Sequence, residues 1–176
     1  MTHDTGITGL IDVPDVIDKA AGLAPGMALH AARRFRTTAI EATQASHDAL
    51  LGEPVPGLST ADRLRVAVHC CEAGGAAELA AHYRDRYRDR SSARPQEAGG
   101  ADAPSPALPA MLHWAALLTT DPKRGDRAAL QALKSAGSSD AAIVALAQLV
   151  AFLSYQMRVV AGLKAMALPR AGGVGR

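Results

Sequence analysis

Two side chains that can transfer protons, Glu78 and His82, stand four residues apart in this chain. On an α-helix this spacing places both side chains on one face, so the carboxylate can orient the imidazole. A carboxylate beside an imidazole is a common way to build a general base. The alternative is an exposed pair of the kind that any helix can carry. The spacing alone leaves both interpretations open.

The two cysteines of the chain, Cys70 and Cys71, are direct neighbours. Adjacent helical residues point about 100° apart, so a disulfide between them would strain the backbone. Buried cysteines usually behave as small hydrophobic residues, which makes packing the favoured interpretation. The alternative is a redox role for Cys70 and Cys71, because His69 and Glu72 flank them.

Polar residues in the C-terminal third are candidates for the wall of a substrate pocket. By helical rotation, Gln148, Tyr155 and Arg158 lie within about 80° of one another. If they are buried they need partners, either in a structural or subunit-interface network or around a ligand. In the second case Arg158 or Tyr155 would hold an anionic group. His113 and Trp114 are a further candidate wall, although a core tryptophan is the favoured interpretation.

Neither a metal nor a cofactor is indicated by the sequence. No metal-ligand spacing connects the histidines outside the Glu78–His82 pair, and Gly74-Gly75 lacks the surrounding pattern of a phosphate-binding loop. The formal net charge of +2 comes from charges of mixed sign, which gives no electrostatic case for nucleic acid. We therefore expect a small-molecule substrate and no nucleic-acid partner.

The location of the protein is inferred from three features. Two adjacent cysteines make no disulfide framework, which fits a reducing compartment. The N-terminus has no basic region followed by an apolar run, as a signal peptide would. The most apolar segment, 141–153, is shorter than the roughly 20 residues that cross a bilayer. We expect a cytoplasmic protein that does not bind a membrane.

The composition predicts an all-α fold in a single domain, 1–176. Hydrophobic residues make up 48% of the sequence but aromatic residues only 3%, so alanine, leucine and valine must form the core. Such a composition favours helices over strands. The predicted helices, with approximate ends, span 11–23, 27–51, 60–73, 76–90, 110–118, 126–136 and 141–167. Between them, 91–109 is expected to be a mobile internal loop, and 169–176 a frayed tail.

Local signals fix several helix ends. Ser59 is a predicted N-cap and Gly74-Gly75 a predicted break between two helices. Asp12 or Asp15 can cap the first helix, and Ser138-Ser139-Asp140 precedes the last one. That last helix is apolar almost all round. We therefore expect it to be buried on several sides, by its own domain or by another subunit.

Several segments resemble the alkylhydroperoxidase-D-like (carboxymuconolactone decarboxylase) family. The core helix pair of that family is similar to LSTADRLRVAV at 58–68, followed by the glycine break and LAAH at 79–82. Its peroxidase-related branch has a closing helix similar to SSDAAIV at 138–144 and FLSYQMRVVAGL at 152–163. DVID at 15–18 and QASHDAL at 44–50 resemble a subgroup known only by its carboxymuconolactone decarboxylase domain. The resemblance implies a helical bundle of the alkylhydroperoxidase-D type and a homo-oligomer.

The chain departs from the family at its redox motif. Thiol-active members carry a Cys-x-x-Cys pair, with a histidine four residues after the second cysteine. If His82 is that histidine, the cysteine positions hold Gly75 and Glu78. Neither residue can form a thiolate or resolve a sulfenic acid, but Glu78 can exchange a proton. The resemblance thus implies acid–base chemistry at His82 and Glu78, as in the decarboxylase branch, which needs no cysteine pair.

The candidate residues and the family resemblance allow two functions. The first is an enzyme related to the peroxidases, an oxidoreductase by family, acting on a small hydroperoxide, lactone or similar carbonyl compound. Glu78 and His82 would transfer protons, and Arg158 or Tyr155 would hold an anionic group. The second is a degenerate, non-catalytic family member that serves as a binding or assembly subunit. The sequence does not separate the two.

Overall fold

A computed structural model describes residues 15–52, 55–93 and 103–168. These residues form eight α-helices and one short 3-10 helix, and they contain no strand, which confirms the predicted all-α bundle. The predicted frayed tail at 169–176 and the start of the first predicted helix, 11–14, lie outside the described residues.

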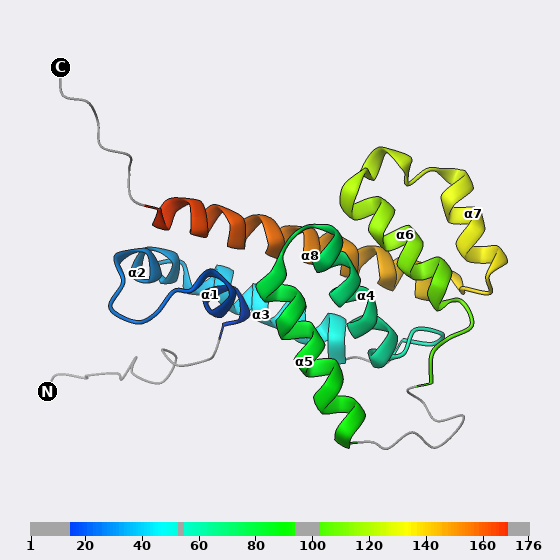
Figure 1. Ribbon diagram of the computed structural model, residues 1–176, viewed down its shortest axis with the longest axis horizontal. Coiled ribbons are helices and arrows are strands. Elements are labelled where there is room, and N and C mark those ends of the chain that lie inside the picture. The colour runs from blue at the N-terminus through cyan, green and yellow to red at the C-terminus, as the bar shows by residue number, and fades with distance from the viewer. Residues whose placement is uncertain (1–14, 53–54, 94–102, 169–176) are drawn as a thin grey trace, which may run out of the picture.

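One long helix organises the others. α8 (Asp140–Ala167) runs along the long axis of the molecule (Figure 1). The helices α1 (Val16–Ala21), α2 (Ala28–Arg34) and α3 (Thr37–Gly52) contact α8 along its C-terminal half. α6 (Leu108–Thr120) lies beside its N-terminal half, and α7 (Arg127–Ser135) packs on α6 after the 3-10 helix Pro122–Arg124. α4 (Thr60–Ala73) and α5 (Ala77–Ala93) occupy the centre.

The hairpin of α4 and α5 forms where the sequence predicts it. The Ser59 hydroxyl accepts a hydrogen bond of 3.0 Å from the backbone N–H of Asp62 and so caps α4. Gly74 ends this helix, and Gly75 adopts a φ of +71°, a conformation that residues with a Cβ rarely take. Gly75 therefore reverses the chain within a few residues and brings α5 back against α4.

The predicted helix 27–51 is wrong in one respect, because the structure divides it at Phe35 and Arg36 into α2 and α3. The two arginines at the end of α2 turn toward α1: Arg33 Nη1 lies 2.8 Å from Asp18 Oδ1, and Arg34 Nη2 lies 2.9 Å from Asp18 Oδ2. Asp15 also accepts from Arg33, at 2.9 Å, while capping α1. These long-range ion pairs fix the direction of α2, and α3 starts anew beyond them.

Helix ends differ from the prediction around the expected loop 91–109. α5 continues to Ala93 and α6 already starts at Leu108, while 94–102 lie outside the described part of the chain. The start of α8 is as predicted, since the Ser139 hydroxyl accepts from the backbone N–H of Ala142 at 3.1 Å. Differences of a few residues at helix ends do not alter the packing.

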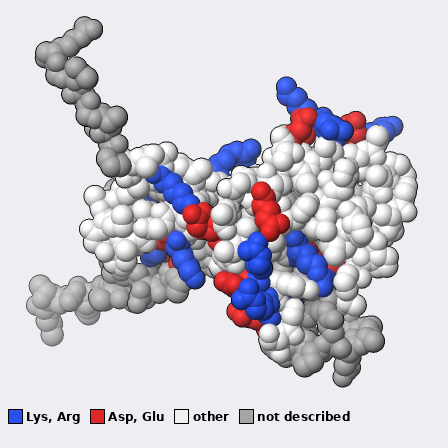
Figure 2. Space-filling view, viewed as in Figure 1, with Lys and Arg blue, Asp and Glu red and all other residues white. Residues whose placement is uncertain are grey.

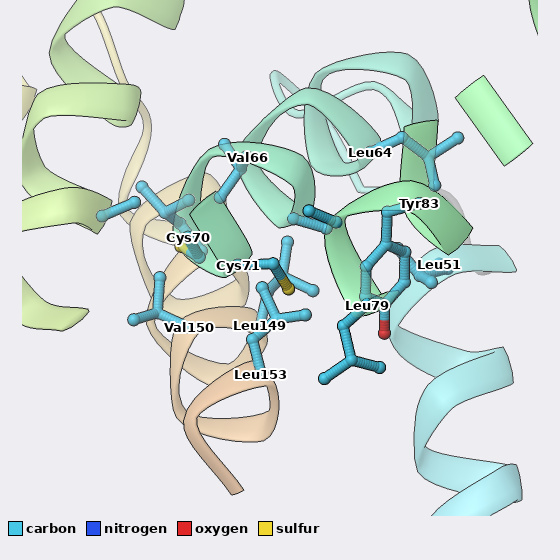
Figure 3. Close-up of a cluster of buried hydrophobic side chains, with 14 of the residues drawn as sticks. Leu51, Leu64, Val66, Cys70, Cys71, Leu79, Tyr83, Leu149, Val150 and Leu153 are labelled. Carbon is cyan, nitrogen blue, oxygen red and sulfur yellow. The ribbon is translucent and has the colours of Figure 1, made fainter. Parts of the chain in front are cut away.

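The core lies between α4, α5 and α8. Figure 3 shows Cys70 and Cys71 of α4, Leu79 and Tyr83 of α5, and Leu149 of α8 among the side chains that meet there. All five are fully buried. The Met157 side chain of α8 reaches Gly74, where an added Cβ would lie 2.6 Å from the sulfur and would displace the end of that side chain.

α8 is covered on one side and open on the other. Its buried residues include Leu146, Leu149 and Leu153, whereas Val144 is 57% exposed and Tyr155 45% exposed. Among the described helices, α8 alone has the length and apolar composition of a membrane span. Its covered side nevertheless holds the centre of the core. A helix buried on several sides was predicted, and here its own domain covers only one.

Candidate functional site

Two histidines from different helices lie together beside α8. The ring centroids of His47 on α3 and His82 on α5 are 6.2 Å apart. Tyr83 packs edge-on against His82 at 5.1 Å, and Phe152 of α8 lies 6.3 Å from His47. We call His47, His82, Tyr83, Arg86 and Gln156 the histidine cluster. Its members are contributed by three helices, so the tertiary fold assembles it.

His47 is held as a neutral imidazole with a defined tautomer. Arg86 Nη1 lies 2.9 Å from His47 Nε2, and because a guanidinium can only donate, Nε2 must accept. The proton is then on Nδ1, which donates to Asp48 Oδ1 at 3.0 Å. Burial lowers the pKa of His47, and the Arg86 charge lowers it further against the opposing effect of the Asp48 hydrogen bond.

His82 is the unsatisfied group of the cluster. Its Nε2 is buried and has no hydrogen-bond partner within the described ranges. Burial lowers its pKa to about 4; the nearby Arg86, His47 and Lys19 side chains act in the same direction, and Asp85 acts against it. His82 is therefore neutral at pH 7, and a buried polar atom without a partner costs free energy unless a ligand or water satisfies it.

A buried hydrogen bond ties the helix of His82 to α8. The Tyr83 hydroxyl donates to Gln156 Oε1 at 2.5 Å, and the two side chains are 0% and 1% exposed. Burial raises the pKa of Tyr83, so the phenol stays protonated. Gln156 and His47 were not singled out from the sequence. A glutamine within an apolar helical stripe is the one local signal that could have identified Gln156.

Glu78 forms an ion pair with a lysine of α8 and not with His82. Its carboxylate is exposed and accepts from Lys164 of α8 at 2.5 Å. That hydrogen bond is the main reason why the pKa of Glu78 is lowered. The structure thus shows Glu78 paired with a lysine, whereas the sequence suggested that it orients His82.

The two cysteines are free thiols inside the core. Both are 0% exposed. Burial raises the pKa of the Cys70 thiol, and it raises the pKa of the Cys71 thiol to about 12. A reactive cysteine needs an accessible thiolate, which these surroundings oppose. Figure 3 shows Cys71 among Leu79, Tyr83 and Leu149, as expected of a packing residue.

The other predicted pocket residues do not join the histidine cluster. Gln148, Tyr155 and Arg158 are exposed on the open side of α8. Tyr155 reaches α3, where its hydroxyl lies 3.1 Å from that of Thr43. On α6, His113 is exposed, whereas Trp114 is buried with its Nε1 unpartnered among the described residues. Trp114 thus occupies the core position that the sequence favoured.

The described residues form surface hollows but no group that could bind a metal ion. A surface hollow of about 520 Å³ at the junction of α2 and α3 is lined by residues 35–39 and Ala42, none of which belongs to the histidine cluster. No group of three His, Cys, Asp or Glu side chains that could hold a metal ion is found among the described residues. The histidine cluster brings titratable groups of α3 and α5 together, as the ion pairs of Asp15, Asp18, Arg33 and Arg34 do for α1 and α2.

Comparison with known proteins supports the fold. A crystal structure of an uncharacterized peroxidase-related protein from Silicibacter sp. TM1040 is similar over 89% of this chain and 82% of that chain. The TM-score is 0.52 and the sequence identity is 20%. No family model matches the sequence, and no curated protein matches it. The chain therefore has a fold like that of a peroxidase-related protein.

Proposed function

We propose that this protein is a small-molecule enzyme that performs general acid–base chemistry at His82. The observation that carries the proposal is the buried Nε2 of a neutral histidine inside the histidine cluster, which has no hydrogen-bond partner among the described residues. A general base must be unprotonated before it acts and must have a free lone pair or exchangeable proton toward the substrate. His82 meets the first condition and has a ring nitrogen available for the second.

The surroundings of His82 favour one orientation of its ring. Tyr83 packs edge-on against it and is itself fixed to α8 by the bond to Gln156. His47 is fixed in turn by Arg86 and Asp48. Side chains held by packing and hydrogen bonds position a reactive group more sharply than a loop does. In this proposal Tyr83 and Gln156 are positioning residues. The role of Glu78 in proton transfer stays a prediction.

Thiol chemistry is the less favoured route to a peroxidase-like activity. Cys70 and Cys71 are fully buried and their pKa values are raised, so neither presents a thiolate to a hydroperoxide. This supports the acid–base reaction over a thiol peroxidase, whose substrate would be a hydroperoxide. A lactone or similar carbonyl compound, which can exchange a proton next to its carbonyl group, fits the proposal better.

The test compares two sets of variants on two classes of substrate. Turnover of cumene hydroperoxide with a thiol reductant, and of a panel of small lactones, is measured for the wild type, His82→Gln and Cys70→Ser/Cys71→Ser. We expect lactone turnover that falls at least about a hundredfold in His82→Gln and persists in the cysteine variant. Hydroperoxide turnover lost only in the cysteine variant would refute the acid–base assignment.

A binding or assembly role is the second candidate, and one observation favours it. The open side of α8 exposes Val144 and Tyr155, large side chains that could contact another subunit. A homo-oligomer was predicted from family resemblance and accommodates either function. Light scattering after size exclusion should give more than one chain per particle, and Val144→Asp should reduce that number. The predicted cytoplasmic location stays a prediction.

A further inference from the structure

The Nε2 atom of His82 is covered in this structure. It is buried, so a molecule as small as water cannot touch it from outside. The members of the histidine cluster lie on α3, α5 and α8, and moving any of these helices would take the cluster apart. The element that uncovers His82 must therefore contact these helices without supplying a member of the cluster.

The first helix, α1, meets this condition. It packs against both α5 and α8, and the histidine cluster contains none of its residues (Figure 1). Burial lowers the pKa of His82 and that of His47; Lys19 of α1 adds to the first effect, and Asp15, the N-cap of α1, opposes the second. Because such effects need charges at short range, α1 lies over the histidine cluster.

Ion pairs join α1 and α2 into one unit, which we call the α1–α2 cap (residues 15–34). Asp18 pairs with Arg33 at 2.8 Å and with Arg34 at 2.9 Å, and Asp15 pairs with Arg33 at 2.9 Å. Both aspartates are buried, so salt screens these pairs little. Figure 2 shows positive and negative side chains intermixed over this end of the molecule. The two helices have only six and seven residues and would not persist alone in water, so they must dock and detach together.

A small apolar surface attaches the α1–α2 cap to the rest of the protein. Its buried apolar residues are Ile17, Ala20, Ala21 and Leu23. Within α2, the buried residue is the polar His30. A unit that buries few apolar side chains opens at a lower free energy than the core does. The cap should therefore detach while α4, α5 and α8 stay packed around their shared core.

We propose that the α1–α2 cap opens as one unit, ahead of the rest of the fold, and so controls access to His82. This inference rests on the proposed function, because a cover over His82 has a use only if His82 reacts. Phe35 and Arg36 are the hinge, since they lie between α2 and α3 and are exposed. The closed cap keeps water from Nε2, and a substrate enters when the cap leaves α5 and α8.

The first measurement is amide hydrogen exchange of the full-length chain, followed peptide by peptide in a mass spectrometer. We expect the amides of α1 and α2 to exchange together, at least about tenfold faster than those of α4 and α8. Low concentrations of urea should change the exchange of the α1–α2 cap little, because its opening exposes much less surface than global unfolding.

The second measurement follows access to His82 by its acylation with diethyl pyrocarbonate, mapped on peptides. Ile17→Ala truncates a 1% exposed side chain of α1, and it should speed cap exchange and His82 acylation by the same factor, at least about tenfold. Asp18→Asn breaks ion pairs within the cap and should also speed both.

Leu133→Ala is the matched control for these variants. Leu133 is 0% exposed but belongs to α7, so its truncation weakens the core without touching the α1–α2 cap. Both rates should stay within about twofold of the wild type. Far-UV circular dichroism shows that each variant is folded.

The outcomes distinguish this inference from the proposed function. Exchange of α1 and α2 at the rates of α4 and α8 would overturn the inference, because the cap would then open only by global unfolding. Acylation of His82 that stays constant while Ile17→Ala speeds cap exchange would overturn it as well, because the cap would not cover the nitrogen. Neither readout needs turnover, so lactone turnover that survives in His82→Gln refutes the acid–base function alone.

Discussion

Removing the Tyr83 hydroxyl should destabilise the protein more than its small volume suggests. In Tyr83→Phe, the ring remains but Gln156 Oε1 loses its 2.5 Å hydrogen bond in a place that is 1% exposed. A net hydrogen bond contributes about 1 kcal/mol, and an acceptor left buried without a partner costs about 1–3 kcal/mol. We expect a loss of about 2 kcal/mol in the free energy of unfolding. For a domain of this size, that lowers the melting temperature by about 4–8 °C.

A double-mutant cycle in urea denaturation tests the reasoning. Gln156→Leu removes the acceptor and leaves the phenol unsatisfied, at a similar cost of about 2 kcal/mol. The double variant Tyr83→Phe/Gln156→Leu removes both polar partners and should lose less than the sum of the singles by at least about 1 kcal/mol. Tyr87→Phe is the control, because Tyr87 is half-buried and water can replace its 2.6 Å bond from Arg65.

The result that refutes this account is additivity. If the two single losses simply sum, the hydroxyl and the amide are not coupled, and the bond does not tie α5 to α8. A change below about 0.5 kcal/mol in Tyr83→Phe would lead to the same conclusion. Because the phenyl ring of this variant still packs against His82, a change in turnover at constant stability would show that the bond also positions the histidine.

Three further predictions concern stability. The pKa of His82 is about 4 in the folded protein and 6.5 ordinarily, so the unfolded chain binds more protons between these two pH values. The free energy of unfolding must therefore fall as the pH drops through this window. Urea titrations at pH 7 and pH 5 should show a smaller fall for His82→Gln than for the wild type. Asp18→Asn removes a 5% exposed carboxylate that both arginines of α2 share, and should cost about 3 kcal/mol in the same assay; a cost below 1 kcal/mol would show that the ion pairs do not hold α1. Gly75→Ala should cost about 1 kcal/mol because φ is +71°, whereas Gly162→Ala, within α8 and with open space around it, should stabilise; equal signs in calorimetry would contradict this.

The parts of the fold that local chemistry decides could be predicted from the sequence. Ser59 and Ser139 cap α4 and α8 because a hydroxyl before a helix satisfies a backbone N–H of its first turn. Gly74-Gly75 ends one helix and begins another because only glycine readily takes the positive φ found at Gly75. Each of these signals acts over a few residues and depends little on tertiary structure.

Long-range contacts decided the features that the sequence did not reveal. The break between α2 and α3 follows from arginines that pair with Asp18, a residue on another helix. The histidine cluster was likewise hidden, since His47 and Gln156 join His82 only when α3 and α8 pack beside α5. Glu78 had the right spacing for His82, but Lys164 of α8 offers it a stronger, oppositely charged partner.

The complete burial of Cys70 and Cys71 makes them reporters of how the protein opens. A disulfide reagent such as 5,5′-dithiobis(2-nitrobenzoic acid) can reach these thiols only when α4 separates from α5 or α8. When reclosing is faster than modification, the labelling rate equals the rate of an exposed thiol multiplied by the equilibrium constant of opening. The two thiols sit where α4, α5 and α8 meet, so in this regime their labelling reports the free energy of the openings that expose the core, without any added probe.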